Sequence, residues 1–393
     1  MTPPAETGQG LGKAFPAVAF ISLVFLINYT DRAIIGPLLV HMEKSLGLDH
    51  VQATSLLLFL STGFFFGVFS SGFATARFAP RRVVAISAVG SGLMLLFIAR
   101  SHSLSEVRLG FTMLGLVAGL YLPAAMATLG TLVSQENWSR TIAIHELAPN
   151  LSFILSPILA EAIVERGGWQ GAMVVMGCVS LVMGTLFLIF GKGGTERTDR
   201  PSASGVTGAL KAPVFWVFVW FFGVGVGGEF APFSVLPLSL TSEQGLGSAE
   251  ASRLLSLSRL VSPFVVLIGG WAATRLGIGR TILVFLLFHG VSLMAMALPH
   301  SLAGTAGLLI PMTGQAMATA FVFPALFTLF SRAFPLGQQP MLLSLSIPIA
   351  SYIGTGITPV FLGVCGEYLS FSFGYFAFGV ICLASIPLLR FCR

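Results

Sequence analysis

The sequence predicts an all-α membrane protein whose twelve transmembrane helices form two six-helix bundles. Three observations predict this class: an apolar composition, long apolar runs between short polar loops, and a similarity between the two halves of the chain. Hydrophobic residues make up 55% of the 393 residues, charged residues make up 9%, and the mean hydropathy is +0.90. A water-soluble domain carries roughly a quarter charged residues, whereas a bilayer penalises charge and accepts apolar surface. The composition therefore excludes a soluble globular protein.

Twelve apolar runs, each bounded by charges or turn residues, are long enough to cross a bilayer as helices. We place these spans at residues 14–40, 51–74, 83–99, 106–133, 141–164, 170–191, 212–239, 250–274, 281–299, 304–330, 340–365 and 370–389.

The longest polar segment, 191–211, follows the sixth span and carries Gly, Ser, Pro and mixed charges. Such a composition is typical of a flexible linker. It divides the chain into an N-terminal six-helix bundle (1–190) and a C-terminal one (212–393). The two halves repeat one another, since Ser71–Arg77 after the second span resembles Gly269–Arg275 after the eighth. Two repeated bundles with a binding site at their interface are a transporter architecture.

The distribution of Lys and Arg predicts the orientation. The loops on the side of the N-terminus carry fourteen of these residues, and the loops on the other side carry five. Because positive loops stay inside, both termini are expected in the cytoplasm. The segment Met1–Leu11 lacks the pattern of a cleavable signal peptide. Short loops favour a bacterial inner membrane.

Nucleic acid and metal are not expected partners. The basic residues are scattered in short loops and form no block that would bind nucleic acid. The four cysteines lie in apolar runs without metal-ligand spacing, so we expect neither a zinc site nor a disulfide framework. These are Cys178, Cys365, Cys382 and Cys392. No nucleophile–base arrangement or phosphate loop appears, so we expect no enzymatic activity and no cofactor.

Four short segments carry recognisable motifs. They are G-W-A-A-T-R-L-G-I-G-R (270–280), G-L-V-A-G-L-Y-L-P (115–123), G-W-Q (168–170) and N-Y-T-D-R (28–32). The first three resemble the inner-loop, fourth-helix and sixth-helix motifs of the major facilitator superfamily. The last resembles the first-helix stretch of its organic anion:cation symporter branch. The resemblance implies the major facilitator fold, with helices one, two, four, five, seven, eight, ten and eleven around a central cavity.

The chain also departs from the family pattern. Both inner-loop copies lack the acidic residue that normally helps to latch the cytoplasmic gate, because Thr75 or Ala76 and Ala273 or Thr274 stand there. The fifth-helix antiporter signature G-x-x-x-G-P is replaced by a segment with Ser152 and Ser156-Pro157, which weighs against a drug/proton antiporter. The remaining gating candidates are Arg77, Arg82, Arg275, Arg280, His145 and Glu146.

Four ionisable residues lie deep within the predicted spans. Asp31, Glu229 and Arg259 are nine or ten residues from the outer ends of their spans, or about 14 Å below the outer surface at 1.5 Å per residue. Arg32 adjoins Asp31 on a helix that the resemblance places around the cavity. An ionisable group inside a membrane is a functional candidate because its burial is costly unless it meets water or a partner.

The charges suggest a role for each group. Arg32 and Arg259 would bind an anionic substrate, since guanidinium pairs bidentately with carboxylate. Asp31 or Glu229 would carry the coupled proton. Further substrate contacts are expected from Asn28, Tyr29 and Gln315. The alternative is that the acids and arginines only neutralise one another between helices.

The sequence thus favours a monomeric alternating-access transporter that couples protons to the import of a small organic anion, such as a monocarboxylate or sugar acid. Its expected partners are this substrate, protons and the lipid bilayer. A first rival is a proton-coupled exporter of drugs or metabolites. A second rival, a membrane sensor or scaffold, would need a soluble domain or signalling tail, and the sequence contains neither.

Overall fold

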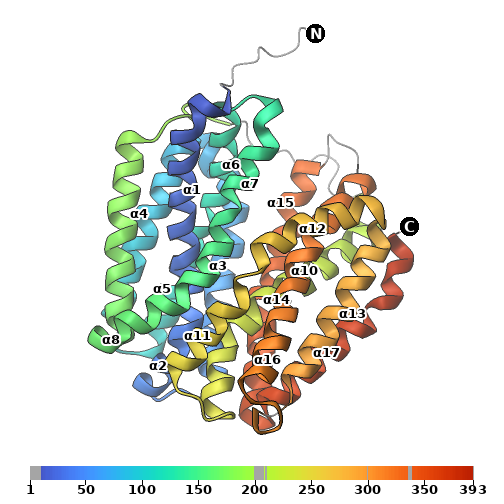
Figure 1. Ribbon diagram of the computed structural model, residues 1–393. Coiled ribbons are helices and arrows are strands. Elements are labelled where there is room, and N and C mark those ends of the chain that lie inside the picture. The colour runs from blue at the N-terminus through green and yellow to red at the C-terminus, as the bar shows by residue number, and fades with distance from the viewer. Residues whose placement is uncertain (1–9, 199–207, 209, 299, 335–338, 393) are drawn as a thin grey trace.

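The computed structural model describes residues 10–198, 208, 210–298, 300–334 and 339–392. The described residues form helices and no β-strand (Figure 1). The first half contains α1 (Leu11–Ala33), α2 (Ile35–Leu46), α3 (His50–Arg77), α4 (Pro80–Ala99), α5 (Leu104–Gly119), α6 (Tyr121–Leu132), η1 (Gln135–Asn137), α7 (Trp138–His145) and α8 (Leu147–Phe190). The second half contains α10 (Pro213–Ser242), α11 (Ser248–Arg259), α12 (Ser262–Arg275), α13 (Ile278–Met296), α14 (His300–Ala333), α15 (Gln339–Ser351), η2 (Tyr352–Ile357), α16 (Thr358–Tyr368), α17 (Phe371–Ala384) and η3 (Ile386–Cys392).

The predicted number of spans is confirmed for the described residues. Ten helices are long and apolar enough to cross a membrane, and Ser248–Val266 together with Ile268–Arg275, bent by 43° relative to each other, forms one more span. The stretch Arg140–Phe190 holds two of the predicted spans, which part at Gly168, where φ is 62° and ψ is −172°. Together these make twelve. The chain is therefore a multi-pass integral membrane protein with an all-α fold.

Several spans are interrupted near their middle. The first span divides into α1 and α2 at Ile34, and the eighth divides into α11 and α12. Arg32 and Arg259 each lie in the last turn before such a break. The backbone stays in the right-handed helical region at Ile34, Leu260 and Val261, so both interruptions are local.

Glycines allow α3 and α5 to pack backbone against backbone. A Cβ atom at Gly115 would overlap the carbonyl oxygen of Leu60, and one at Gly119 would lie 2.6 Å from the carbonyl oxygen of Phe64. Gly115 and Gly119 both belong to the fourth-helix motif, and both lie directly against the backbone of α3. Small residues commonly allow such close contact where membrane helices meet.

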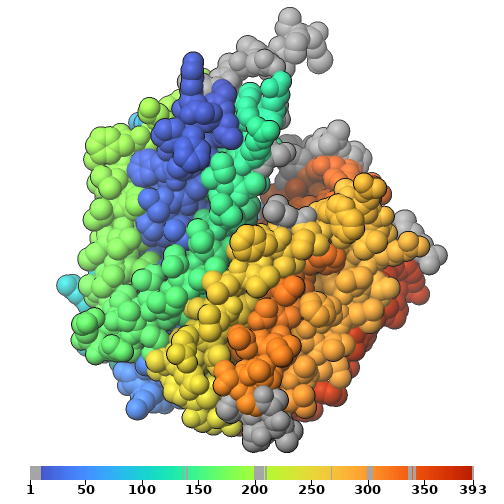
Figure 2. Space-filling model, in the orientation of Figure 1, coloured from blue at the N-terminus to red at the C-terminus, as the bar shows by residue number. Residues whose placement is uncertain are grey.

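The two halves touch from their middle to one end of the molecule. Ser61 of α3 lies 2.8 Å from Thr355 of η2, the hydroxyl of Ser256 donates to the carbonyl of Ile154, and the amide of His50 donates to Glu367. Figure 2 shows α8 and α11 in contact low in the view, whereas the halves separate toward the end that carries the N-terminus. The molecule is thus closed at the end where α2 leads into α3.

Part of the predicted linker packs on the first half. The guanidinium of Arg81 donates to the carbonyl of Gly191 at 2.7 Å, and the hydroxyl of Thr198 donates to that of Thr75 at 2.8 Å. Thr75 is one of the two positions where the missing acidic residue would stand. Residues 199–207 and 209 of the predicted linker lie outside the described residues.

We expect Gly115→Ala to destabilise the protein by about 1–3 kcal/mol, because the added methyl group must push α3 away from α5. Thermal unfolding in detergent measures this as a lower melting temperature. The matched control is Gly279→Ala in α13, where a Cβ atom meets nothing within 4 Å. If the Gly115 variant melts at the wild-type temperature, the close contact between α3 and α5 is absent.

Candidate functional site

A proline in the middle of α10 frees a backbone carbonyl deep in the protein. Pro232 has no N–H, so the carbonyl of Gly228, four residues earlier, loses its helical donor. The side-chain amide of Gln315 from α14 donates to that carbonyl instead. The next carbonyl, that of Glu229, accepts a hydrogen bond from Arg259 Nη2 at 2.9 Å. Side chains from two other helices therefore bind two successive carbonyls of α10.

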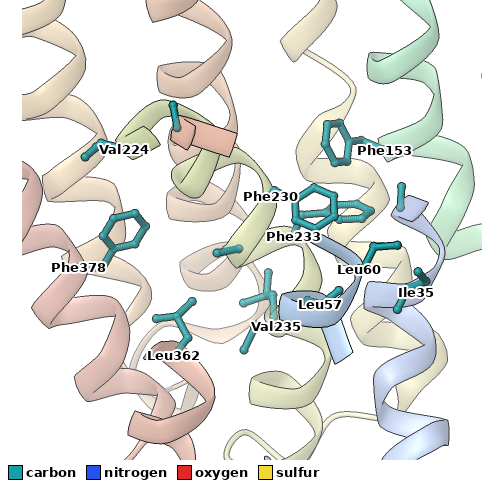
Figure 3. Packing of buried hydrophobic residues seen from close by; sticks show 14 of the residues in the cluster. Ile35, Leu57, Leu60, Phe153, Val224, Phe230, Phe233, Val235, Leu362 and Phe378 are labelled. Carbon is teal, nitrogen blue, oxygen red and sulfur yellow. The ribbon is translucent and has the colours of Figure 1, made fainter. Parts of the chain in front are cut away.

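The guanidinium of Arg259 lies between aromatic rings. Its central carbon is 5.1 Å from the ring centre of Phe153 in α8 and 5.4 Å from that of Phe233 in α10. Arg259 is only 3% exposed, and its Nε atom is buried with no hydrogen-bond partner among the described residues. Figure 3 shows Phe153 close to Phe230 and Phe233, where the two halves of the chain meet.

Arg32 has a similar environment in the first half. Its guanidinium lies 4.7 Å from the ring centre of Tyr29 and 4.6 Å from that of Phe64, and its Nε donates to the carbonyl of Asn28. The ring of Tyr29 in turn meets that of Phe153 edge to face at 5.3 Å. A chain of contacts thus runs from Arg32 through two rings to Arg259 and joins the two halves.

Neither arginine is neutralised by a carboxylate. Within the described ranges, the ion pairs closer than 4 Å all join a histidine to a glutamate: His41 to Glu161, His50 to Glu43 and His145 to Glu146. The alternative expectation, a closed set of salt bridges between the deep acids and arginines, is therefore not observed in this part of the chain. Aromatic faces and backbone carbonyls stabilise both cations instead.

Tyr29 marks the centre of the site. Four charged side chains lie within electrostatic range of its hydroxyl: Glu229, Arg32, Glu146 and Arg259. Glu229 is half-buried, and Glu146, at the break between α7 and α8, has a side chain that is 53% exposed. The structure therefore brings together Arg32, Tyr29, Glu229 and Arg259 of the predicted site, with Glu146 added from the predicted gate.

Asn28 and Asp31 point elsewhere. Asp31 is fully buried in the first half and accepts a 2.6 Å hydrogen bond from Ser180 of α8, while the amide of Asn28 donates to Ser87 of α4. Consecutive helical residues point about 100° apart, which is why Arg32 and Asp31 face different neighbours. The proton-carrying role of Asp31 and the substrate contact of Asn28 stay predictions.

The gating candidates also have different environments. His145 is buried, stacks on Phe25 at 4.2 Å and lies 3.2 Å from the hydroxyl of Tyr121. This places it within the first half and not at a surface. The four arginines are exposed: Arg77, Arg82, Arg275 and Arg280. Their gating role stays a prediction, whereas Arg81, which the sequence did not single out, ties the α3–α4 turn to Gly191.

The aromatic partners of the arginines were missed by sequence reasoning. Phe64, Phe153 and Phe233 are three of 35 phenylalanines, and no spacing sets them apart. The free carbonyl of Gly228 did have a signal, since a proline four residues later always removes the helical donor.

A model of the family described as Major Facilitator Superfamily matches residues 21–347. The chain belongs to the major facilitator superfamily. The resemblance of its motifs is confirmed at this level, and membership of the organic anion:cation symporter branch stays a prediction.

Relatives of this superfamily protein are known at low identity. An MFS-type efflux pump of Mycolicibacterium smegmatis is 28% identical over 187 residues, which are 46% of this chain and 42% of the pump. A triacylglyceride transporter of Mycobacteroides abscessus is 23% identical over 325 residues, which are 66% of this chain and 63% of the transporter. The chain thus matches these relatives over 42% and 63% of their lengths.

Solved structures support the major facilitator fold. A bacterial homolog of the human lysosomal transporter Spinster, in an inward-facing and occupied conformation, superposes with a TM-score of 0.76 at 14% identity and covers 98% of this chain and 97% of its own. A D-xylose-proton symporter gives a TM-score of 0.76 at 14% identity and covers 96% of each chain. At such identity the likeness establishes the fold alone. The match to the superfamily model supports the prediction that the chain is a transporter and not an enzyme.

We expect Asp31→Leu to lower the melting temperature, because it leaves the buried hydroxyl of Ser180 without its acceptor at a cost of about 1–3 kcal/mol. Asp31→Asn keeps an acceptor oxygen and should melt close to the wild type. Ligand affinity should change little in Asp31→Asn, since the carboxyl group of Asp31 bonds to Ser180 and forms no ion pair within 4 Å of a described arginine. A large loss of affinity in Asp31→Asn with a normal melting temperature would show that Asp31 takes part in ligand binding.

Proposed function

We propose that this member of the major facilitator superfamily is a secondary transporter that works by alternating access and carries a small organic anion together with a proton. The proposed substrates are monocarboxylates and sugar acids. We further propose that it lies as a monomer in a bacterial inner membrane with both termini in the cytoplasm. The end at which the two halves meet, where α2 leads into α3, would then be the outer end. The molecule would be in an inward-facing conformation.

One observation carries the proposal of an anionic substrate: Arg259 is buried at the meeting point of the halves without a carboxylate partner in the described part of the chain. Its Nε donor is also without a partner there. A buried charge is costly when it is unpaired, and so is a buried donor. A substrate carboxylate would supply both the counter-charge and the missing acceptor. Arg32, in contact with the same group of aromatic rings, offers a second cation from the other half.

Glu229 is the proposed proton carrier. It lies on α10 within electrostatic range of Arg259, and it forms no ion pair closer than 4 Å to a described residue. Ionisation of a half-buried carboxyl group is unfavourable without a partner, so protonation and substrate binding should assist one another. A protonated Glu229 leaves a positive charge on Arg259 for the substrate to neutralise.

Arg259→Ala is expected to abolish the binding of carboxylates. A ligand that binds the folded state raises its melting temperature, so a screen of purified protein against carboxylates, sugars, amino acids and cationic drugs finds the best ligand. Calorimetric titration with that ligand then measures the variants. Arg259→Lys should recover little affinity, because the planar fork of donors is lost. The control is Arg253→Ala, an exposed arginine on the same helix. Unchanged affinity in Arg259→Ala would remove this residue from the site.

Glu229→Gln is expected to retain exchange of substrate across liposome membranes but to lose accumulation driven by a pH gradient, because the amide mimics the protonated acid and cannot release a proton. In the wild type, affinity for an anion should strengthen as the pH falls from 8 to 5.5, with a coupling of about 1–3 kcal/mol. Accumulation by Glu229→Gln at the wild-type level would contradict the assignment. Affinity for a cationic drug that weakens on acidification would favour the rival function, proton-coupled efflux.

A further inference from the structure

One carbonyl of α10 depends on a side chain from another helix. Pro232 leaves the carbonyl of Gly228 without a helical donor, and the amide of Gln315 is its donor among the described residues. Gln315 is 2% exposed and belongs to α14. A buried carbonyl without a donor is unfavourable, so this hydrogen bond stabilises α10 at the point where Pro232 interrupts its hydrogen-bond ladder.

Side chains of α13 and α14 also pack against the backbone of Gly228. The ring of His289 in α13 lies so close to Gly228 that a Cβ atom there would overlap it, and the methyl group of Thr319 lies 3.0 Å from the same point. His289 is fully buried and stacks on Phe285 at 5.2 Å. The backbone of Gly228 is therefore packed against side chains from α13 and α14 and cannot shift toward them.

The position of Gly228 sets that of the next residue, Glu229. The carbonyl of Glu229 binds Arg259 Nη2, and its side chain carries the proposed proton. A movement of the backbone at Gly228 would therefore displace both the carbonyl that binds Arg259 and the carboxyl group of Glu229.

We propose that Gln315 is a positioning residue, which holds the backbone of α10 at Gly228 and thereby keeps Glu229 near Arg259, and that it is not a contact of the substrate. This inference rests on the proposed function only for the roles of Glu229 and Arg259. The hydrogen bond to Gly228 and its dependence on Pro232 stand without it.

Restoring the missing donor tests the proposal. In Pro232→Ala the new N–H can bind the carbonyl of Gly228, so Gln315 should become dispensable. Four proteins make a double-mutant cycle: the wild type, Gln315→Leu, Pro232→Ala and the double variant. The matched control is Thr319→Val, which keeps the methyl group near Gly228 and removes a hydroxyl that bonds only within α14 among the described residues.

The readout is the rate at which dicyclohexylcarbodiimide modifies Glu229 in liposomes at pH 6 to 8, measured by mass spectrometry of the peptide. Carbodiimides react with protonated carboxyl groups, and a nearby guanidinium favours the ionised form. In Gln315→Leu the carboxyl group of Glu229 should move away from the guanidinium of Arg259 and be protonated more often. The modification should then be faster than in the wild type by about fivefold or more. The double variant should match Pro232→Ala within about twofold. Thr319→Val should match the wild type.

Two results would overturn the proposal: a wild-type rate in Gln315→Leu, or an equally large effect of Gln315→Leu in the Pro232→Ala background. Melting temperatures of the same four proteins give a second cycle, in which Gln315→Leu lowers the value by about 2–4 °C only when Pro232 is present. If Gln315→Leu does not fold, a folded double variant supports the proposal and an unfolded one contradicts it. No substrate is needed, so a failure of carboxylate binding in the wild type would contradict the proposed function without changing this result.

Discussion

The cost of a charge inside a membrane is the constraint on which the centre of this protein depends. Arg259 lies where the two halves meet, and water is largely excluded from it. Two phenylalanine rings and the carbonyl of Glu229 stabilise the guanidinium without removing its positive charge. A salt bridge would have neutralised that charge, and no described carboxyl group forms one with Arg259 within 4 Å. The surrounding residues thus maintain a cation that an anionic ligand can still pair with.

The aromatic contacts also explain how the two halves can share one site. Arg32 and Tyr29 belong to α1, Phe153 belongs to α8, and Arg259 belongs to α11. These contacts join α1, α8 and α11 without an ion pair to either arginine in the described part of the chain. Hydrogen bonds between the halves, such as those that Ser248 and Ser252 donate to Glu161, lie toward the closed end.

A missing backbone donor in α10 shapes this centre. Pro232 removes the N–H that would bind the carbonyl of Gly228, and Gln315 supplies a donor in its place. A carbonyl oxygen has two lone pairs, so that of Glu229 can accept from Arg259 beside a helical bond. Gly228 admits the ring of His289 against the backbone. The local geometry of α10 thus depends on contacts with α11, α13 and α14.

The sequence by itself determined the fold class and the twelve spans and singled out Glu229 and Arg259 as ionisable residues within them, because apolar length and the position of a charge along it are properties of a single helix. Only the tertiary structure decided which deep residues meet. Asp31 and Arg32 are adjacent in sequence, yet one bonds to Ser180 and the other lies on Tyr29 and Phe64. Gln315 carries an amide suited to a substrate, but it is turned toward Gly228. The rotation of each helix about its axis sets these contacts, and that rotation depends on packing against neighbours that are distant in the sequence.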